Sequence, residues 1–133
     1  FDKTCYFDKG LIKNLKVDKD YIEKLLDNKQ KEAFALQNKI KDKISLKDKK
    51  VIIVDDGIAT GTTAILASIY CKKALAKEVI LATPLIAKDS LKTVKKYFDK
   101  VISLKIASNL SSVSQFYKYF PQVEDDEVIK NSS

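Results

Sequence analysis

An unbroken run of four β-branched residues, Val51-Ile52-Ile53-Val54, constrains the fold of this chain more than any other feature. Such a run is typical of a strand that is buried on both faces of a parallel sheet. Two further apolar runs, at 78–83 and 101–104, follow at intervals that leave room for a helix between strands. Alternating strands and helices favour parallel pairing through right-handed crossovers. We therefore predict an α/β fold with a mostly parallel sheet in which 51–54 is the central strand.

The remaining elements follow from periodicity and from turn residues. Asp8-Lys9-Gly10 separates two short apolar patches and predicts a hairpin turn. Asp18 or Asp20 is a suitable cap for an amphipathic helix of roughly 20–25 residues, whose apolar positions recur at helical spacing as far as Ile44. A second helix is expected over 64–76, and a third is expected to be capped by Ser90. The strand at 78–83 is expected to end at Pro84.

Composition limits the chemistry that is available. All 25 basic residues are lysine, and with 18 acidic residues the net charge is +7; the chain has no Arg and no His. Without His, the chain lacks the commonest general base and metal ligand, and without Arg it lacks the side chain that binds phosphate bidentately. Any phosphate must be held by backbone N–H groups, hydroxyls or Lys. The two cysteines, Cys5 and Cys71, are too few for a disulfide framework and favour a reduced, cytoplasmic protein.

The segment after the first strand carries the residues suited to chemistry. Asp55 and Asp56 stand at the carboxyl end of the strand, where ligands bind in open α/β sheets. The loop that follows contains two glycines and three threonines and leads into the 64–76 helix, and the N-terminus of a helix binds anions through its amides. Its spacing fits neither a Walker loop nor a dinucleotide fingerprint. The pattern suits a ligand with a phosphate at one end and a diol or metal ion at the other.

The 13 residues 51–63, VIIVDDGIATGTT, closely resemble the phosphoribosyl-pyrophosphate (PRPP) signature of type I phosphoribosyltransferases. The resemblance implies a parallel-sheet, Rossmann-like phosphoribosyltransferase core. It also implies that Asp55 and Asp56 hold the ribose hydroxyls, as the catalytic acids, and that Mg²⁺ arrives with PRPP rather than on ligands of the protein. The positions implied for binding PRPP and its phosphate are Gly57, Ala59, Thr60, Gly61, Thr62 and Thr63.

The reaction implied by the family is replacement of pyrophosphate at ribose C1 by a nitrogen nucleophile, usually a nucleobase. Ala59 stands where the 6-oxopurine salvage enzymes carry an Asp, so the loop looks more like that of adenine phosphoribosyltransferases. The segment 116–123 resembles the C-terminus of a group of predicted prokaryotic phosphoribosyltransferases. Phe116 and Tyr117 are candidates for stacking on the base, with packing of the tail against the core as the alternative.

The chain is expected to form a single domain over 1–133: a flexible-loop region with a long inserted helix (1–50), a PRPP-binding core (51–105) and a C-terminal tail (106–133). Type I enzymes place a strand with a pyrophosphate-binding loop upstream of the signature. We find no such unit in 1–50, and the chain has no Met, so we expect that its N-terminal part is missing and that this chain is an inactive fragment.

Three further questions are left open by the sequence. A non-catalytic PRPP-sensing or RNA-binding regulator on the same fold is the main alternative, although lysines and acids alternate along the long helix, which argues against a nucleic-acid partner. A response-regulator receiver domain also has paired acids after a strand, but Asp99 precedes the 101–104 strand, where a receiver requires its phosphoacceptor to follow one. No membrane partner is expected, and formation of a homodimer is undecided.

Overall fold

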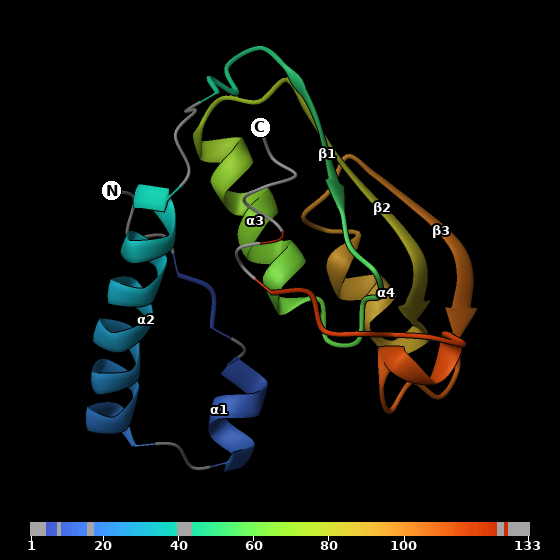
Figure 1. The fold of residues 1–133 in the computed structure, drawn as a ribbon, viewed down its shortest axis with the longest axis horizontal. Helices are drawn as coiled ribbons and strands as arrows, with labels where there is room; N and C mark the ends of the chain where they lie inside the picture. The colour runs from blue at the N-terminus through green and yellow to red at the C-terminus, as the bar shows by residue number, and fades with distance from the viewer. Residues whose placement is uncertain (1–4, 8, 16–17, 40–43, 125–126, 128–133) are drawn as a thin grey trace. The chain divides into compact units, whose positions relative to one another are not determined.

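The computed structural model of the chain describes residues 5–7, 9–15, 18–39, 44–124 and 127, and Figure 1 shows the order of its elements. The chain divides into two compact units, one built around residues 7–44 and one comprising residues 4–6 and 45–120. The single domain expected over 1–133 stays a prediction, because this division concerns compactness alone. None of the helices in the described part of the chain has the length and apolar character needed to cross a bilayer.

The first unit contains two helices, α1 (Lys9–Leu15) and α2 (Lys19–Lys39). The predicted hairpin turn is wrong, because Lys9 and Gly10 begin α1; Asp8 lies outside the described residues. Apolar residues at positions 11, 12 and 15 recur at helical spacing, and this pattern prevails over the local turn residues. The long helix is confirmed as α2, which follows Asp18, while its expected continuation through 40–43 lies outside the described residues.

The second unit holds a three-stranded parallel sheet of β1 (Lys50–Val54), β2 (Glu78–Ala87) and β3 (Lys100–Ala107), in the order β1-β2-β3. The predicted α/β class is therefore confirmed. Register pairs Ile53 of β1 with Leu81 of β2, and Leu81 with Val101 of β3. The connections contain α3 (Thr62–Lys73) and α4 (Lys88–Val94), and a 3₁₀ helix, η1 (Val113–Phe116), follows the last strand (Figure 1).

Both α3 and α4 pack on the same face of this sheet. Ile65 and Cys71 of α3 and Val94 of α4 form one buried cluster with Val79 and Leu81 of β2. The partly buried residues of β1 and β3 that border this cluster are Val51, Ile53 and Val101. The core of the unit therefore lies between the two helices and one side of β2.

The predicted central position of 51–54 is wrong, because β2 pairs with both other strands and β1 lies at an edge of the described sheet. Consecutive strands lie side by side in chain order, which is the commoner arrangement. Burial of the run on both faces is also wrong: Ile52 is 61% exposed and Val54 is 76% exposed. An apolar run predicts a strand, but it does not tell how many strands or helices cover it.

Two predicted boundaries near the second strand are also wrong. β2 continues through Pro84 to Ala87, because the loop after β1 hydrogen-bonds to this second half: the Ile58 amide donates to Leu85 O over 2.9 Å and the Ala87 amide to Ile58 O over 2.8 Å. Ser90 does not cap the helix predicted to follow it, which is α4, since α4 begins at Lys88 and its N-cap is Ala87. The Ser90 hydroxyl instead donates a hydrogen bond to the main-chain oxygen of Ala59.

Candidate functional site

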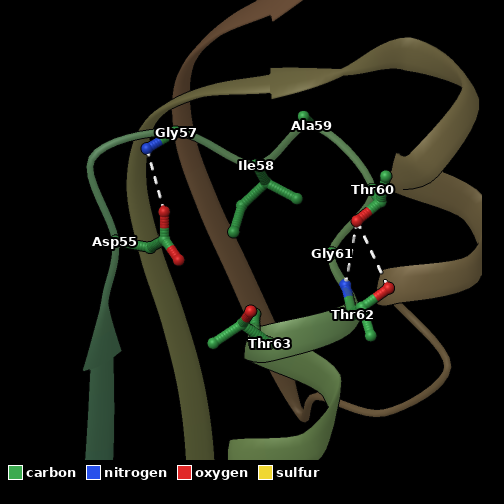
Figure 2. Close-up of a pocket in the computed structure, with 9 residues that line it drawn as sticks. Asp55, Gly57, Ile58, Ala59, Thr60, Gly61, Thr62 and Thr63 are labelled. Atoms are coloured by element: carbon green, nitrogen blue, oxygen red, sulfur yellow. Dashed lines mark hydrogen bonds between the residues drawn. The ribbon is translucent and has the colours of Figure 1, made fainter. Parts of the chain in front are cut away.

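The two carboxylates predicted at the end of β1 lie in a tight turn. The Asp55 amide extends the strand ladder by donating to Ala82 O over 3.2 Å. The Gly57 amide donates to Asp55 Oδ1 over 2.9 Å, so the side chain closes the turn on its own backbone, a habit of Asp residues in turns (Figure 2). The Asp55 side chain is consequently half-buried, whereas Asp56 is exposed.

The middle of the loop is fixed to the sheet by Ile58. This side chain is only 2% exposed, and its backbone N–H and C=O are both bonded to the end of β2. The neighbouring main-chain oxygen, that of Ala59, accepts the Ser90 hydroxyl. The loop formed by residues 55–63 is therefore a continuation of the sheet rather than an independent surface loop. We call it the 55–63 loop.

The loop ends in a glycine whose backbone no other residue would readily adopt. Gly61 is the N-cap of α3 and has a φ of 79°, in the left-handed region. The first helical hydrogen bond runs from the Ile65 amide to Gly61 O over 2.8 Å. The amides of residues 62–64 precede that bond and have no intrahelical acceptor. They are the donors that an anion at the N-terminus of α3 would meet, the Thr62 amide in exchange for its 3.4 Å hydrogen bond to Thr60 Oγ1.

Hydroxyl groups lie beside these amides. Thr60 Oγ1 lies 3.2 Å from Thr62 Oγ1 and 3.4 Å from the Thr62 amide (Figure 2). In the same view the Asp55 carboxylate and the Thr63 side chain both line the pocket that the loop encloses. This pocket has a volume of about 160 Å³ and is lined by Asp55, Gly57, Ile58, Ala59, Thr60, Gly61, Thr62, Thr63 and Ala64.

The structure thus brings every predicted loop residue except Asp56 to one pocket. Asp56 stands between two lining residues in the sequence but does not line the pocket itself. Phe116 and Tyr117 do not line it either. The Tyr117 hydroxyl donates to Asp56 O over 2.6 Å, which brings the tail to the acidic turn, and the Phe116 ring lies under the ammonium of Lys105 at 4.7 Å. None of the described residues that line the pocket is basic.

Burial raises the pKa of the Asp55 carboxyl above its usual value; the Gly57 amide opposes this shift, and the nearby charge of Asp56 adds to it. Burial disfavours the charged form of the group, so hydrogen-bond donors or a cation would favour it again. A diol offers two such donors. The Asp55 carboxylate is therefore suited to a ligand that supplies hydroxyl groups or positive charge to this end of the pocket.

The donor set also bears on a metal ion. The part of the chain that the structure describes contains no group of three or more His, Cys, Asp or Glu residues close enough to hold a metal. Mg²⁺ often binds through one or two carboxylates together with phosphate oxygens of a substrate. Two adjacent acids beside a helix N-terminus are suited to a metal of that kind, which would be brought by its ligand.

Sequence reasoning missed the residues that support the loop from outside. Val94 packs against Gly61, Val113 packs against Gly57, and Ser90 binds the Ala59 carbonyl. Each contact joins segments more than thirty residues apart, so no local pattern could have indicated it. The Tyr117 hydroxyl, which donates to Asp56 O, also supports the loop in a way that the sequence did not indicate.

Comparison with known proteins places these features in context. Residues 4–120 match the family model described as phosphoribosyl transferase domain. Two proteins of Mycobacterium tuberculosis that are provisionally named phosphoribosyl transferases, MT0597 and Rv0571c, are each 38% identical to this chain over 89 residues, which is 67% of this chain and 20% of theirs. The chain therefore spans about a fifth of the length of these relatives.

A solved structure has a similar fold. The crystal structure of TT1426 from Thermus thermophilus superposes with a TM-score of 0.71 at 23% identity, over 86% of this chain and 56% of that one. At this level of identity the likeness concerns the fold alone. It agrees with the α/β arrangement of residues 45–120.

Proposed function

The chain belongs to the phosphoribosyl transferase domain family, and on that premise we propose that it forms the PRPP-binding part of an enzyme that transfers the 5-phosphoribosyl group of PRPP to a nitrogen acceptor. The bond between ribose C1 and the pyrophosphate oxygen breaks, and a bond from C1 to the acceptor nitrogen forms. The observation that carries the proposal is the 55–63 loop, where a half-buried carboxylate and the N-terminus of α3 line one pocket.

In this proposal each end of the pocket has its own role. The amides of residues 62–64, with the hydroxyls of Thr60, Thr62 and Thr63, bind the 5-phosphate, while Gly57, Ala59 and Gly61 let the backbone approach it closely. Asp55 and Asp56 accept hydrogen bonds from the two ribose hydroxyls as ionised carboxylates and are the catalytic residues. Negative charge near the ribose stabilises a transition state with positive charge at C1.

Magnesium and the acceptor complete the proposal. Mg²⁺ would arrive bound to PRPP, where it would neutralise negative charge on the pyrophosphate, and the Asp55 and Asp56 carboxylates would supply negative charge on the ribose side. The acceptor is a nucleobase-like molecule of the kind used in nucleotide salvage, and Phe116 and Tyr117 stack on it. The enzyme works in the cytoplasm, and a homodimer is compatible with it.

Calorimetry with ribose 5-phosphate tests the phosphate end. Thr63→Ala removes one hydroxyl donor to a charged group, so we expect affinity to fall by about 1–3 kcal/mol. Thr93→Ala is the matched control, because Thr93 is an exposed helical threonine outside the pocket. Equal affinity of wild type and Thr63→Ala would rule out this role for the 55–63 loop.

The diol end is tested with PRPP. The double variant Asp55→Asn/Asp56→Asn keeps the shape of the turn but removes both charges, so PRPP affinity and its increase with Mg²⁺ should be lost together. Asp48→Asn is the control: Asp48 is an exposed acid in the turn before β1, with a φ of 59° that Asn tolerates. Release of pyrophosphate from PRPP when a nucleobase is added would contradict the sensor alternative.

A further inference from the structure

The tail and the acidic turn meet at a single peptide group. The Tyr117 hydroxyl donates to the main-chain oxygen of Asp56 over 2.6 Å, across 61 positions of sequence. The Gly57 amide, which belongs to the same peptide group as that oxygen, donates to Asp55 Oδ1 over 2.9 Å. One peptide plane is therefore held at its oxygen by Tyr117 and at its nitrogen by the Asp55 carboxylate.

Packing holds the same turn in place. A Cβ atom added at Gly57 would lie 2.6 and 2.8 Å from the two methyl groups of Val113 and 3.2 Å from Leu85. The backbone of the turn is thus pressed directly between η1 and β2, with no room for even a methyl group. On the tail side the Tyr117 ring packs on Phe120, with 5.0 Å between ring centroids.

We propose that Tyr117 is a positioning residue, which orients the Asp55 carboxylate for a diol through the peptide group between Asp56 and Gly57. A hydrogen bond accepted by a peptide oxygen polarises the group and makes its N–H a stronger donor. The Gly57 amide then holds the Asp55 carboxylate more firmly in one orientation. The inference depends on the proposed function for the identity of its ligand, a ribose phosphate.

Tyr117→Phe removes the hydroxyl and keeps the ring, and Tyr119→Phe is its matched control, because Tyr119 is 82% exposed and two positions away. Two probes separate the ends of the pocket in calorimetry: ribose 5-phosphate uses the carboxylate and the anion site, while inorganic phosphate uses the anion site alone. We expect Tyr117→Phe to weaken ribose 5-phosphate about 3- to 10-fold, the range of one hydrogen bond, and to leave inorganic phosphate unchanged. Equal weakening of both probes would overturn the inference, because it would indicate general loosening of the loop.

A second measurement needs no ligand. The Gly57 amide lowers the pKa of the Asp55 carboxyl, so loss of the polarising hydroxyl should raise that pKa further in Tyr117→Phe and leave it unchanged in Tyr119→Phe. Carboxyl carbon NMR of the free protein measures it directly. An Asp55 pKa that is equal in wild type and Tyr117→Phe overturns the inference. Failure of wild type to bind ribose 5-phosphate would instead contradict the proposed function, and the NMR titration would then decide on Tyr117.

Discussion

Replacing Gly61 by alanine should show how tightly the end of the 55–63 loop is packed. Gly61 has a φ of 79°, and a Cβ atom at this position would lie closer than 3.0 Å to Val94 Cγ2, a separation that real Cβ atoms essentially never show. Val94 is fully buried in the core cluster, so it has little room to move. Gly61→Ala therefore introduces two separate penalties, one in the backbone and one in packing.

The backbone penalty and the packing penalty differ in size, and only the packing penalty can be removed by a second substitution. A left-handed backbone costs an alanine about 1–2 kcal/mol, and overpacking a core typically costs about 1–3 kcal/mol. Together they should lower the free energy of unfolding by about 2–5 kcal/mol. Val94→Ala alone loses two buried methyl groups at about 0.8 kcal/mol each, with a cavity term in addition. In the double variant the steric penalty disappears, because the added methyl group enters the space that Val94 vacates.

Urea unfolding of wild type, both single variants and the double variant measures this coupling. We expect the double variant to be about 1–3 kcal/mol more stable than the sum of the single changes predicts, which is the steric term. Gly57→Ala with Val113→Ala is the comparison pair, since Gly57 meets Val113 without a positive φ. Additivity of Gly61→Ala and Val94→Ala within about 0.5 kcal/mol would refute the argument, because independent sites behave in that way.

Two further predictions concern pH and have opposite signs. The pKa of Asp55 is raised, chiefly by burial. The contribution of this carboxyl to stability is therefore full below the ordinary pKa of an aspartate and is lost as pH rises through the raised value. In urea unfolding, Asp55→Asn should be more stable than wild type at neutral pH, and the difference should vanish in acid. The pKa of Asp99 is lowered, chiefly because the Val79 amide donates to its Oδ2 over 2.7 Å. Its contribution is therefore present above the ordinary pKa and is lost as pH falls through the lowered value, so Asp99→Asn should be less stable than wild type at neutral pH and should approach it in acid. Parallel pH profiles of both variants and wild type would contradict these assignments.

The strands and the loop could be predicted because their residues carry local information. Val51–Val54 is β-branched throughout, and the residues of the 55–63 loop are suited to an anion at a helix N-terminus whatever surrounds them. The edge position of β1 could not be predicted in this way. The residues of a strand predict that it is a strand. Which strands pair with it depends on the rest of the chain.

The errors share a physical cause. Asp8-Lys9-Gly10 has the residues of a turn and Ser90 has those of a helix cap, but both preferences are weak. The helical spacing of the apolar residues after Gly10 prevails over the first, and the start of α4 at Lys88 prevails over the second. Ser90 donates to Ala59 O instead of capping its own helix. Ser90 lies two residues after Lys88, inside α4 and past the N-cap position, so its hydroxyl is available for a tertiary hydrogen bond.

The same contacts support our proposal that this chain, which has no arginine, holds a phosphate. The backbone of the 55–63 loop is hydrogen-bonded to the protein at several points: Gly57 to Asp55, Ile58 to β2 at both its N–H and its C=O, and Ala59 to Ser90. Its amides at residues 62–64 belong to residues that line the pocket, and they have no intrahelical acceptor. The entropy cost of ordering the loop is therefore met during folding, and an incoming anion meets donors that are already aligned. On this proposal, fixed dipoles at a helix N-terminus take the place of the arginine that this sequence lacks.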